Sequence, residues 1–100
     1  MYRATTPTHI FTLPFGADRL KALRITYRQL GKTVLQKTEA DCTFAGNTVR
    51  LELTQQESLL FQSTDWVYVQ LRAVTDGGKV LASQIEKLWP QTCLDEEVLE

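Results

Sequence analysis

The chain is organised around residues 47–61, a stretch that begins with alternating apolar and polar side chains at residues 48–53. The apolar members are Val49, Leu51 and Leu53. Apolar side chains at every second position indicate a strand with one buried and one exposed face. Thr54 and Glu57 then have the spacing of a capping box, in which each side chain accepts a hydrogen bond from the other residue's backbone N–H. The pattern predicts a strand followed by one short helical turn near residues 54–60.

We expect a short strand in each of five further segments. These segments are residues 8–13, 23–28, 33–38, 41–44 and 66–74. In the two clearest of them, the side chains expected to face the core are Leu23, Ile25, Tyr27, Val67, Val69, Leu71 and Ala73. Phe44 is expected to pack inward from a short edge strand. Gly31 and residues 76–78 supply the backbone freedom that tight hairpin turns need.

Residues 80–89 fit two patterns. Leu81, Ile85 and Leu88 have the spacing of one face of a helix. However, the hairpin turn that precedes this segment requires an antiparallel partner for the strand before it. A bulge near Glu86 would then bring Leu88 onto the same face as Leu81. We expect a strand here, with a helix as the alternative.

Six or seven short strands separated by turn residues are typical of an all-β fold. Each strand has one apolar face, and two packed sheets are the smallest arrangement that buries every such face. The sequence therefore predicts an immunoglobulin-like (Ig-like) antiparallel β-sandwich. The chain has 100 residues, 43% of them apolar. This is enough for one domain with a single core and too few for two, so residues 1–100 are expected to form one domain.

The overall charge is nearly balanced, but the two parts of the chain have opposite sign. The net charge of −1 gives no basic footprint, so nucleic acid is not an expected partner. No apolar stretch is long enough to span a membrane, so a membrane is not expected either. Residues 1–38 hold seven basic side chains and one acidic one, whereas residues 39–100 hold four basic and eleven acidic. We expect the two parts to pair within one domain; the alternative is head-to-tail contact between copies.

No arrangement of residues indicates catalysis, a metal site or a cofactor. His9 is the only histidine and has no acid or thiol nearby in the sequence, so we expect a partly exposed structural role. Cys42 and Cys93 are too far apart for a zinc or redox motif. The residues before Thr8 do not form a secretory signal, and thiols of a chain that is not exported stay reduced, so both cysteines are expected to be free. We expect no enzyme.

The candidate interface lies on the exposed face of the strand at 66–74 and of the strand at 23–28. Its residues are Trp66, Tyr68, Arg72, Arg24 and Arg28. Aromatic side chains next to arginine are enriched at protein interfaces. The alternatives are that a neighbouring loop covers Trp66 and Tyr68, and that the two arginines of the earlier strand are simply solvated.

The order of motifs resembles a group of small proteins of about this length that are encoded among the structural genes of tailed phages and prophages. The matching stretches are THIFTLP at residues 8–14, LRITY at 23–27 with Gln29, GKTVLQK at 31–37, GNTV at 46–49, LTQQE at 53–57, VQLR at 69–72 and GKVLAS at 78–83. A weaker likeness is to the N-terminal β-sandwich domain of phage baseplate upper proteins.

This resemblance implies a non-enzymatic virion structural or assembly protein, such as a baseplate, tail or neck component. Such a protein acts by binding other virion subunits or copies of itself, in the virion and in the host cytoplasm during assembly. The alternative is a stand-alone β-sandwich module or inhibitor that recognises a host protein or a carbohydrate. The acidic tail at residues 92–100 is expected to be either a docked end or a peptide that binds a partner.

Overall fold

The computed structural model describes residues 1–100, most of which lie in eight strands joined by short turns. The strands are β1 (Thr8–Thr12), β2 (Leu20–Gln29), β3 (Lys32–Thr38), β4 (Thr43–Ala45), β5 (Thr48–Glu52), β6 (Val67–Thr75), β7 (Val80–Ala82) and β8 (Glu86–Leu88). Helical structure is limited to α1 (Gln55–Ser58) and two 3-10 turns, at Ala17–Arg19 and Glu39–Asp41. The predicted all-β class is confirmed.

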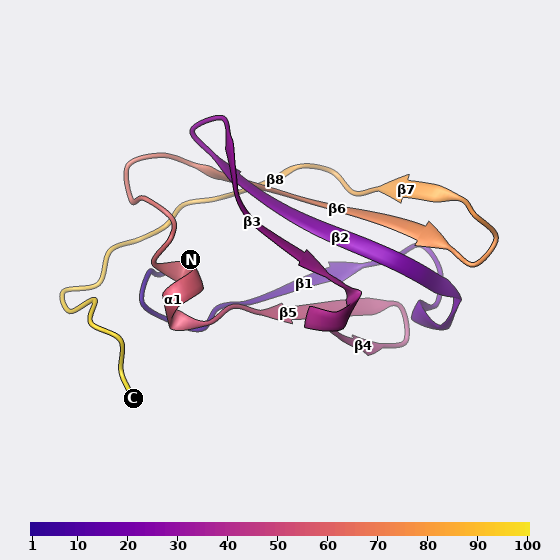
Figure 1. The fold of residues 1–100 in the computed structure, drawn as a ribbon, viewed down its shortest axis with the longest axis horizontal. Coiled ribbons are helices and arrows are strands. Elements are labelled where there is room, and N and C mark those ends of the chain that lie inside the picture. The colour runs from indigo at the N-terminus through magenta and orange to yellow at the C-terminus, as the bar shows by residue number, and fades with distance from the viewer.

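The strands form two antiparallel sheets that lie as two layers (Figure 1). The smaller sheet has the order β1-β5-β4, and the larger has the order β3-β2-β6-β7 with β8 also paired to β6. β7 pairs with the C-terminal part of β6 and β8 with its N-terminal part, so together they form one edge. The longest strands, β2 and β6, pair with each other at the centre of the larger sheet.

One hydrophobic core lies between the sheets. Its members are Leu13, Leu23, Ile25, Tyr27, Val49, Leu51, Leu53, Phe61, Val67, Val69, Leu71 and Ala73. Every position that the alternation of β2, β5 and β6 predicts to be inward is buried. Phe44 in β4, also expected to pack inward, has a side chain that is 40% exposed. The expectation that it packs inward is wrong, since β4 is a three-residue outer strand with no further strand to cover it.

The predicted capping box joins the smaller sheet to α1. The Thr54 hydroxyl accepts from the N–H of Glu57 at 3.1 Å, and the Glu57 carboxylate accepts from the N–H of Thr54 at 2.9 Å. The same carboxylate forms an ion pair with Lys37, which points inward from the edge strand β3. Burial raises the pKa of Glu57, but hydrogen bonds from Lys37 and Thr54 outweigh it, and the net pKa is lowered. This contact connects the larger sheet to α1.

Residues 80–89 form strand rather than helix, but as two short strands instead of one. Leu81 lies opposite Ala73 and Leu88 lies opposite Val67, and the register shifts by one residue between β7 and β8. The Ser83 hydroxyl accepts from the N–H of Leu71 at 3.0 Å at this interruption. The predicted irregularity is therefore present, but before Glu86 rather than at it. This split accounts for eight strands where the sequence predicts six or seven.

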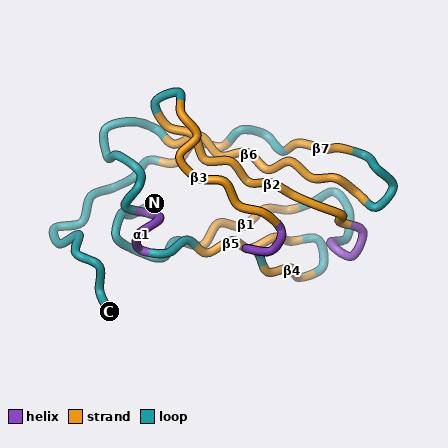
Figure 2. The backbone as a smooth tube through the Cα atoms, viewed as in Figure 1, coloured by secondary structure: helices purple, strands orange, loops and turns teal.

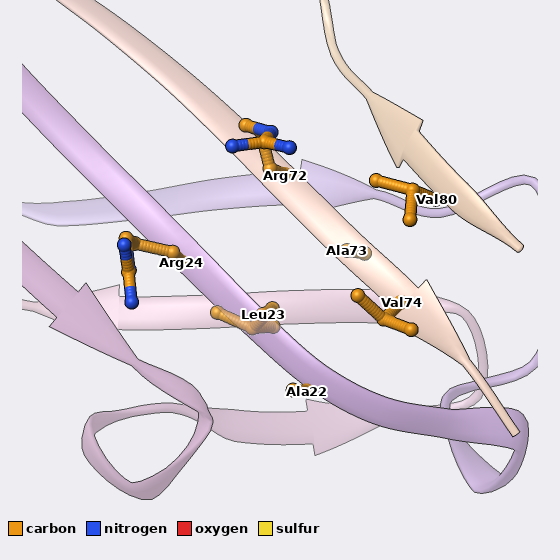
Figure 3. Close-up of a pocket in the computed structure, with 7 residues that line it drawn as sticks. All are labelled: Ala22, Leu23, Arg24, Arg72, Ala73, Val74 and Val80. Carbon is orange, nitrogen blue, oxygen red and sulfur yellow. The ribbon is translucent and has the colours of Figure 1, made fainter. Parts of the chain in front are cut away.

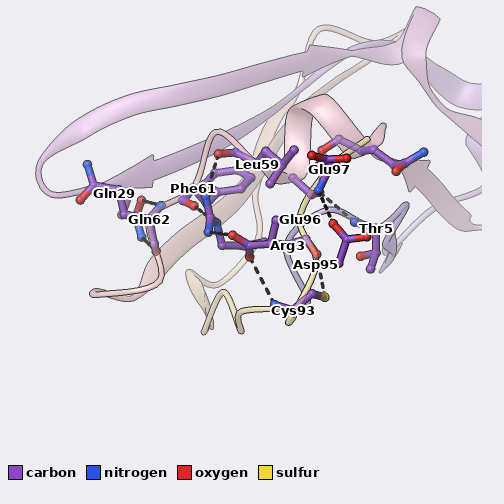
Figure 4. Close-up of polar contacts among 12 residues, drawn as sticks. Arg3, Thr5, Gln29, Leu59, Phe61, Gln62, Cys93, Asp95, Glu96 and Glu97 are labelled. Carbon is purple, nitrogen blue, oxygen red and sulfur yellow. Dashed lines mark hydrogen bonds and ion pairs between the residues drawn. The ribbon is translucent and has the colours of Figure 1, made fainter. Parts of the chain in front are cut away.

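The segments before β1 and after β8 are docked against α1 and the residues that follow it (Figure 4). Arg3 donates from Nε to the carbonyl of Phe61 at 2.8 Å and forms an ion pair with Glu96 at 2.6 Å. The Gln55 side chain both donates to and accepts from the backbone of Leu99. The acidic tail is therefore a docked end, although it contains no helix or strand (Figure 2).

The ion pairs join the basic first part of the chain to the acidic remainder. They are Arg3–Glu96, Arg19–Asp76 and Lys37–Glu57. The expected charge pairing between the two parts is therefore present at these three ion pairs. Arg24 and Arg28, which belong to the same basic part, have no carboxylate partner. The charge asymmetry is therefore only partly neutralised inside the molecule.

A buried tyrosine, Tyr27, forms a hydrogen bond with the half-buried histidine, His9, across the core. The Tyr27 hydroxyl lies 2.6 Å from His9 Nδ1, and Tyr27 is fully buried. Burial lowers the pKa of His9 and raises the pKa of Tyr27. The tyrosine therefore donates the hydrogen bond, and the neutral imidazole accepts it. His9 is partly exposed, as predicted, and contributes a hydrogen bond to the packing of the two sheets.

This pair predicts a pH dependence of stability. The pKa of His9 is lower in the folded chain than its unfolded value of about 6.5. The unfolded chain therefore binds more protons just below that pH, and the free energy of unfolding falls as the pH falls from about 6.5 toward the lowered pKa. Urea unfolding at pH 7.5, 6.5 and 5.5 measures this. In His9→Gln, whose amide oxygen accepts the same hydrogen bond without titrating, this loss should be absent. An equal loss in both chains would contradict the assignment.

Candidate functional site

The five residues of the candidate interface meet on the outer face of the larger sheet. Arg24 and Arg28 extend from β2, and Tyr68 and Arg72 extend from β6, with Trp66 directly before β6. The register places Arg24 opposite Arg72 and Arg28 opposite Tyr68. All five side chains are exposed, because the residues between them fill the core. The sequence predicted that these five side chains are exposed. The structure shows which of them lie opposite each other on β2 and β6.

A depression of about 230 Å³ lies beside the two facing arginines, over the start of β2, the end of β6 and the start of β7 (Figure 3). Ala22, Val74 and Val80 give it an apolar lining. Arg24 and Arg72 stand beside these residues and carry their guanidinium groups above the sheet (Figure 3). The depression therefore combines an apolar floor with two positive charges, which suits a ligand with both an aliphatic group and a carboxylate.

The arginines of this face have no internal counter-charge. None of the three ion pairs of the chain involves Arg24, Arg28, Arg72 or Lys87. The only side-chain hydrogen bond among these groups runs from Arg28 to the carbonyl of Gly31 at 3.0 Å. Like charges directly opposite each other on neighbouring strands are destabilising. By this rule the Arg24–Arg72 pair lowers stability, and no ion pair within the chain compensates for it.

The other end of the face is aromatic. The rings of Trp66 and Trp89 meet edge to face with 5.1 Å between centroids, and Lys87 Nζ lies 5.1 Å from the Trp66 ring. Trp66, Tyr68 and Trp89 remain 40%, 43% and 39% exposed, respectively. The neighbouring segment therefore covers Trp66 only in part. Lys87 and Trp89 were not predicted, because their place depends on the register shift between β7 and β8.

A buried amide holds the loop that leads to Trp66 (Figure 4). Gln29 is 3% exposed, and its Nε2 donates to the carbonyls of Gln62 and Asp65 at 2.6 and 2.9 Å. Its Oε1 accepts from the N–H of Gln62 at 2.8 Å. Asp65 in turn accepts from the N–H of Trp66 at 2.8 Å. Through this loop, Trp66 is held to β2 as well as to β6, which it directly precedes.

The histidine, the two cysteines and the carboxylates do not come together as a second candidate site. His9 Nδ1 is hydrogen-bonded to the Tyr27 hydroxyl, and both Cys42 and Cys93 are free thiols. No group of three or more His, Cys, Asp or Glu side chains is arranged to hold a metal ion. None of the helices has the length and hydropathy needed to cross a bilayer.

Comparison with protein-family models, curated proteins and solved structures found no match to this chain. The interpretation of the face therefore depends on its own geometry.

The Gln29 anchor predicts a stability loss. Replacing this residue by leucine, Gln29→Leu, leaves the backbone groups of Gln62 and the carbonyl of Asp65 without their partner. An unpartnered buried polar group costs about 1–3 kcal/mol, so the free energy of unfolding in urea should fall by about that amount. Gln36→Leu on the exposed side of β3 is the matched control and should change it by less than about 0.5 kcal/mol. Equal effects of the two substitutions would show that Gln29 is not an anchor.

The facing arginines predict that one acidic substitution stabilises the chain. Arg72→Glu replaces a repulsive cross-strand pair with an attractive one and should raise the free energy of unfolding by about 0.2–1 kcal/mol. Arg72→Gln removes the repulsion alone and should give a smaller gain. Both gains should shrink in 1 M NaCl, where screening is strong. Urea titrations at two salt concentrations measure this, and a loss of stability in both variants would contradict the repulsion.

Proposed function

We propose that this chain is a non-enzymatic binding and assembly protein that uses the outer face of its larger sheet to bind an acidic protein surface. The observation that carries this proposal is Arg24 directly opposite Arg72, above an apolar floor and without an internal carboxylate. Arginine forks match the geometry of carboxylates, and two of them fix a partner in orientation as well as position.

The aromatic end of the face supports a protein partner. Tryptophan, tyrosine and arginine dominate the binding energy of protein interfaces, and Trp66, Tyr68 and Trp89 lie on the same face as the arginines. Their positions are held by paired strands and by the Gln29 anchor. A binding surface built on strands loses little conformational freedom when the partner docks.

We further propose that the chain works as a phage or prophage virion component, in the baseplate, tail or neck, with an Ig-like sandwich as its scaffold. The resemblance of its motifs to small phage structural proteins supports this role. So do the exposed edges of both sheets, which subunit contacts in rings and tubes can use. The partners would be other virion subunits or copies of itself, in the virion and in the host cytoplasm during assembly.

The alternative is a stand-alone module or inhibitor that recognises a host protein or a carbohydrate. The observation in its favour is the cluster of Trp66, Tyr68 and Trp89, whose rings are amphipathic and partly open to solvent. A carbohydrate would use these rings and not the arginines at the other end of the face. The two functions therefore differ in which end of the face binding requires.

Binding of a labelled acidic polypeptide tests the proposed face. Fluorescence anisotropy with poly-L-glutamate should show binding that weakens about tenfold or more in Arg24→Ala/Arg72→Ala, a loss of about 1.4 kcal/mol. Lys32→Ala/Arg50→Ala removes the same charge elsewhere and should change the affinity less than about twofold. No binding, or equal losses in both variants, would overturn the proposal. Tighter binding of a single-stranded oligonucleotide would overturn it in favour of nucleic acid, which also uses cations interleaved with aromatic rings.

The virion role has its own test. Mass spectrometry of purified particles from the strain that carries the gene should detect the chain at a copy number comparable with a structural subunit. Its absence from the particles and from assembly intermediates would contradict the virion role while leaving the binding face untouched.

A further inference from the structure

We infer that the acidic ligand of the Arg24–Arg72 depression is the segment 94–98 of a second copy of this chain, so that copies associate head to tail. This inference rests on the proposed function of the face and names its partner. It uses the basic residues that the internal ion pairs leave without carboxylates. It also uses the acidic residues of the tail, which outnumber the one cation that contacts them.

The tail is held so that it presents this segment outward. Arg3 binds Glu96, and the backbone N–H of Cys93 donates to the same carboxylate at 3.2 Å. Gln55 holds Leu99 by two hydrogen bonds. These contacts fix the segment on both sides, so its residues need little further ordering when a partner binds.

The presented side chains match the depression in chemistry. Leu94 is fully exposed, and Asp95 and Glu97 beside it are exposed and have no cationic partner. An exposed aliphatic side chain followed by two unpaired carboxylates is the complement of an apolar depression beside two guanidinium groups. Arg24 and Arg72 would then bind the carboxylates while Leu94 enters the depression.

The positions of the two surfaces favour contact between copies over contact within one. The tail ends at one end of the long axis, whereas the start of β2, the end of β6 and the start of β7, which surround the depression, lie toward the other end (Figure 1). The molecule extends 47 Å along that axis. A docked tail therefore does not reach its own depression.

A contact between two different surfaces of the same chain does not stop at a dimer. Such a heterologous contact produces a ring when the rotation between neighbours closes and a filament when it does not. The contact thus supplies a geometry for an assembly built from copies of one small chain. The internal ion pairs neutralise only some of the opposite charges of the two parts of the sequence. The contact between copies would pair some of the charges that remain.

Sedimentation velocity of the full chain and two charge-reversal variants tests this inference. The face variant is Arg24→Glu/Arg72→Glu, and the tail variant is Asp95→Lys/Glu97→Lys. The unmodified chain should increase in mass between about 10 μM and 1 mM, the range of weak contacts, and less so at high salt. Each variant alone should remain monomeric. Their equimolar mixture should associate again, because the face variant keeps its native tail and the tail variant keeps its native face.

The outcomes separate this inference from the proposed function. The tail variant should still bind labelled poly-L-glutamate, since its face is unchanged, and circular dichroism should show that both variants are folded. If the unmodified chain stays monomeric at 1 mM while poly-L-glutamate binds, the tail is not the ligand and the proposed face stands. If neither association nor poly-L-glutamate binding occurs, the proposed face fails as well. Association that survives both reversals would place the contact elsewhere and overturn the inference.

Discussion

The antiparallel pairing of β2 with β6 is the constraint on which the rest of the structure depends. One face of this pair supplies Ile25, Tyr27, Val69 and Leu71 to the core. Because side chains alternate along a strand, the same register that buries these residues brings the intervening arginines together on the opposite face. A slip of one residue would exchange the two faces. The core and the candidate site are thus two consequences of one register.

The candidate face also carries charges that no ion pair within the chain neutralises. Internal ion pairs neutralise charges at the edges and ends of the molecule, as at Lys37 and Arg3. The arginines at the centre of the larger sheet have no ion-pair partner, although exposed carboxylates occur elsewhere in the chain. Natural proteins commonly retain such local costs at functional sites. The distribution of unpaired charge is therefore more informative here than the net charge, which is close to zero.

Much of this architecture could be predicted from local sequence, because alternation and turn residues act over a few positions. The buried faces of β2, β5 and β6, the capping box at Thr54 and the hairpin turns all belong to this class. Contacts between distant segments could not be predicted in the same way. The His9–Tyr27 hydrogen bond and the Gln29 anchor join residues that only the packing of the two sheets brings together. The exposure of Phe44 was missed because alternation gives the direction of a side chain but not whether anything lies above it.

The one-residue register shift between β7 and β8 has a consequence for how copies of this molecule can meet. A long, regular outer strand would offer a continuous row of backbone donors and acceptors, on which a neighbouring sheet could extend without limit. Here the border consists of two strands of three residues each, and the register with β6 shifts between them. This border therefore lacks the long regular row that unlimited growth by strand addition needs.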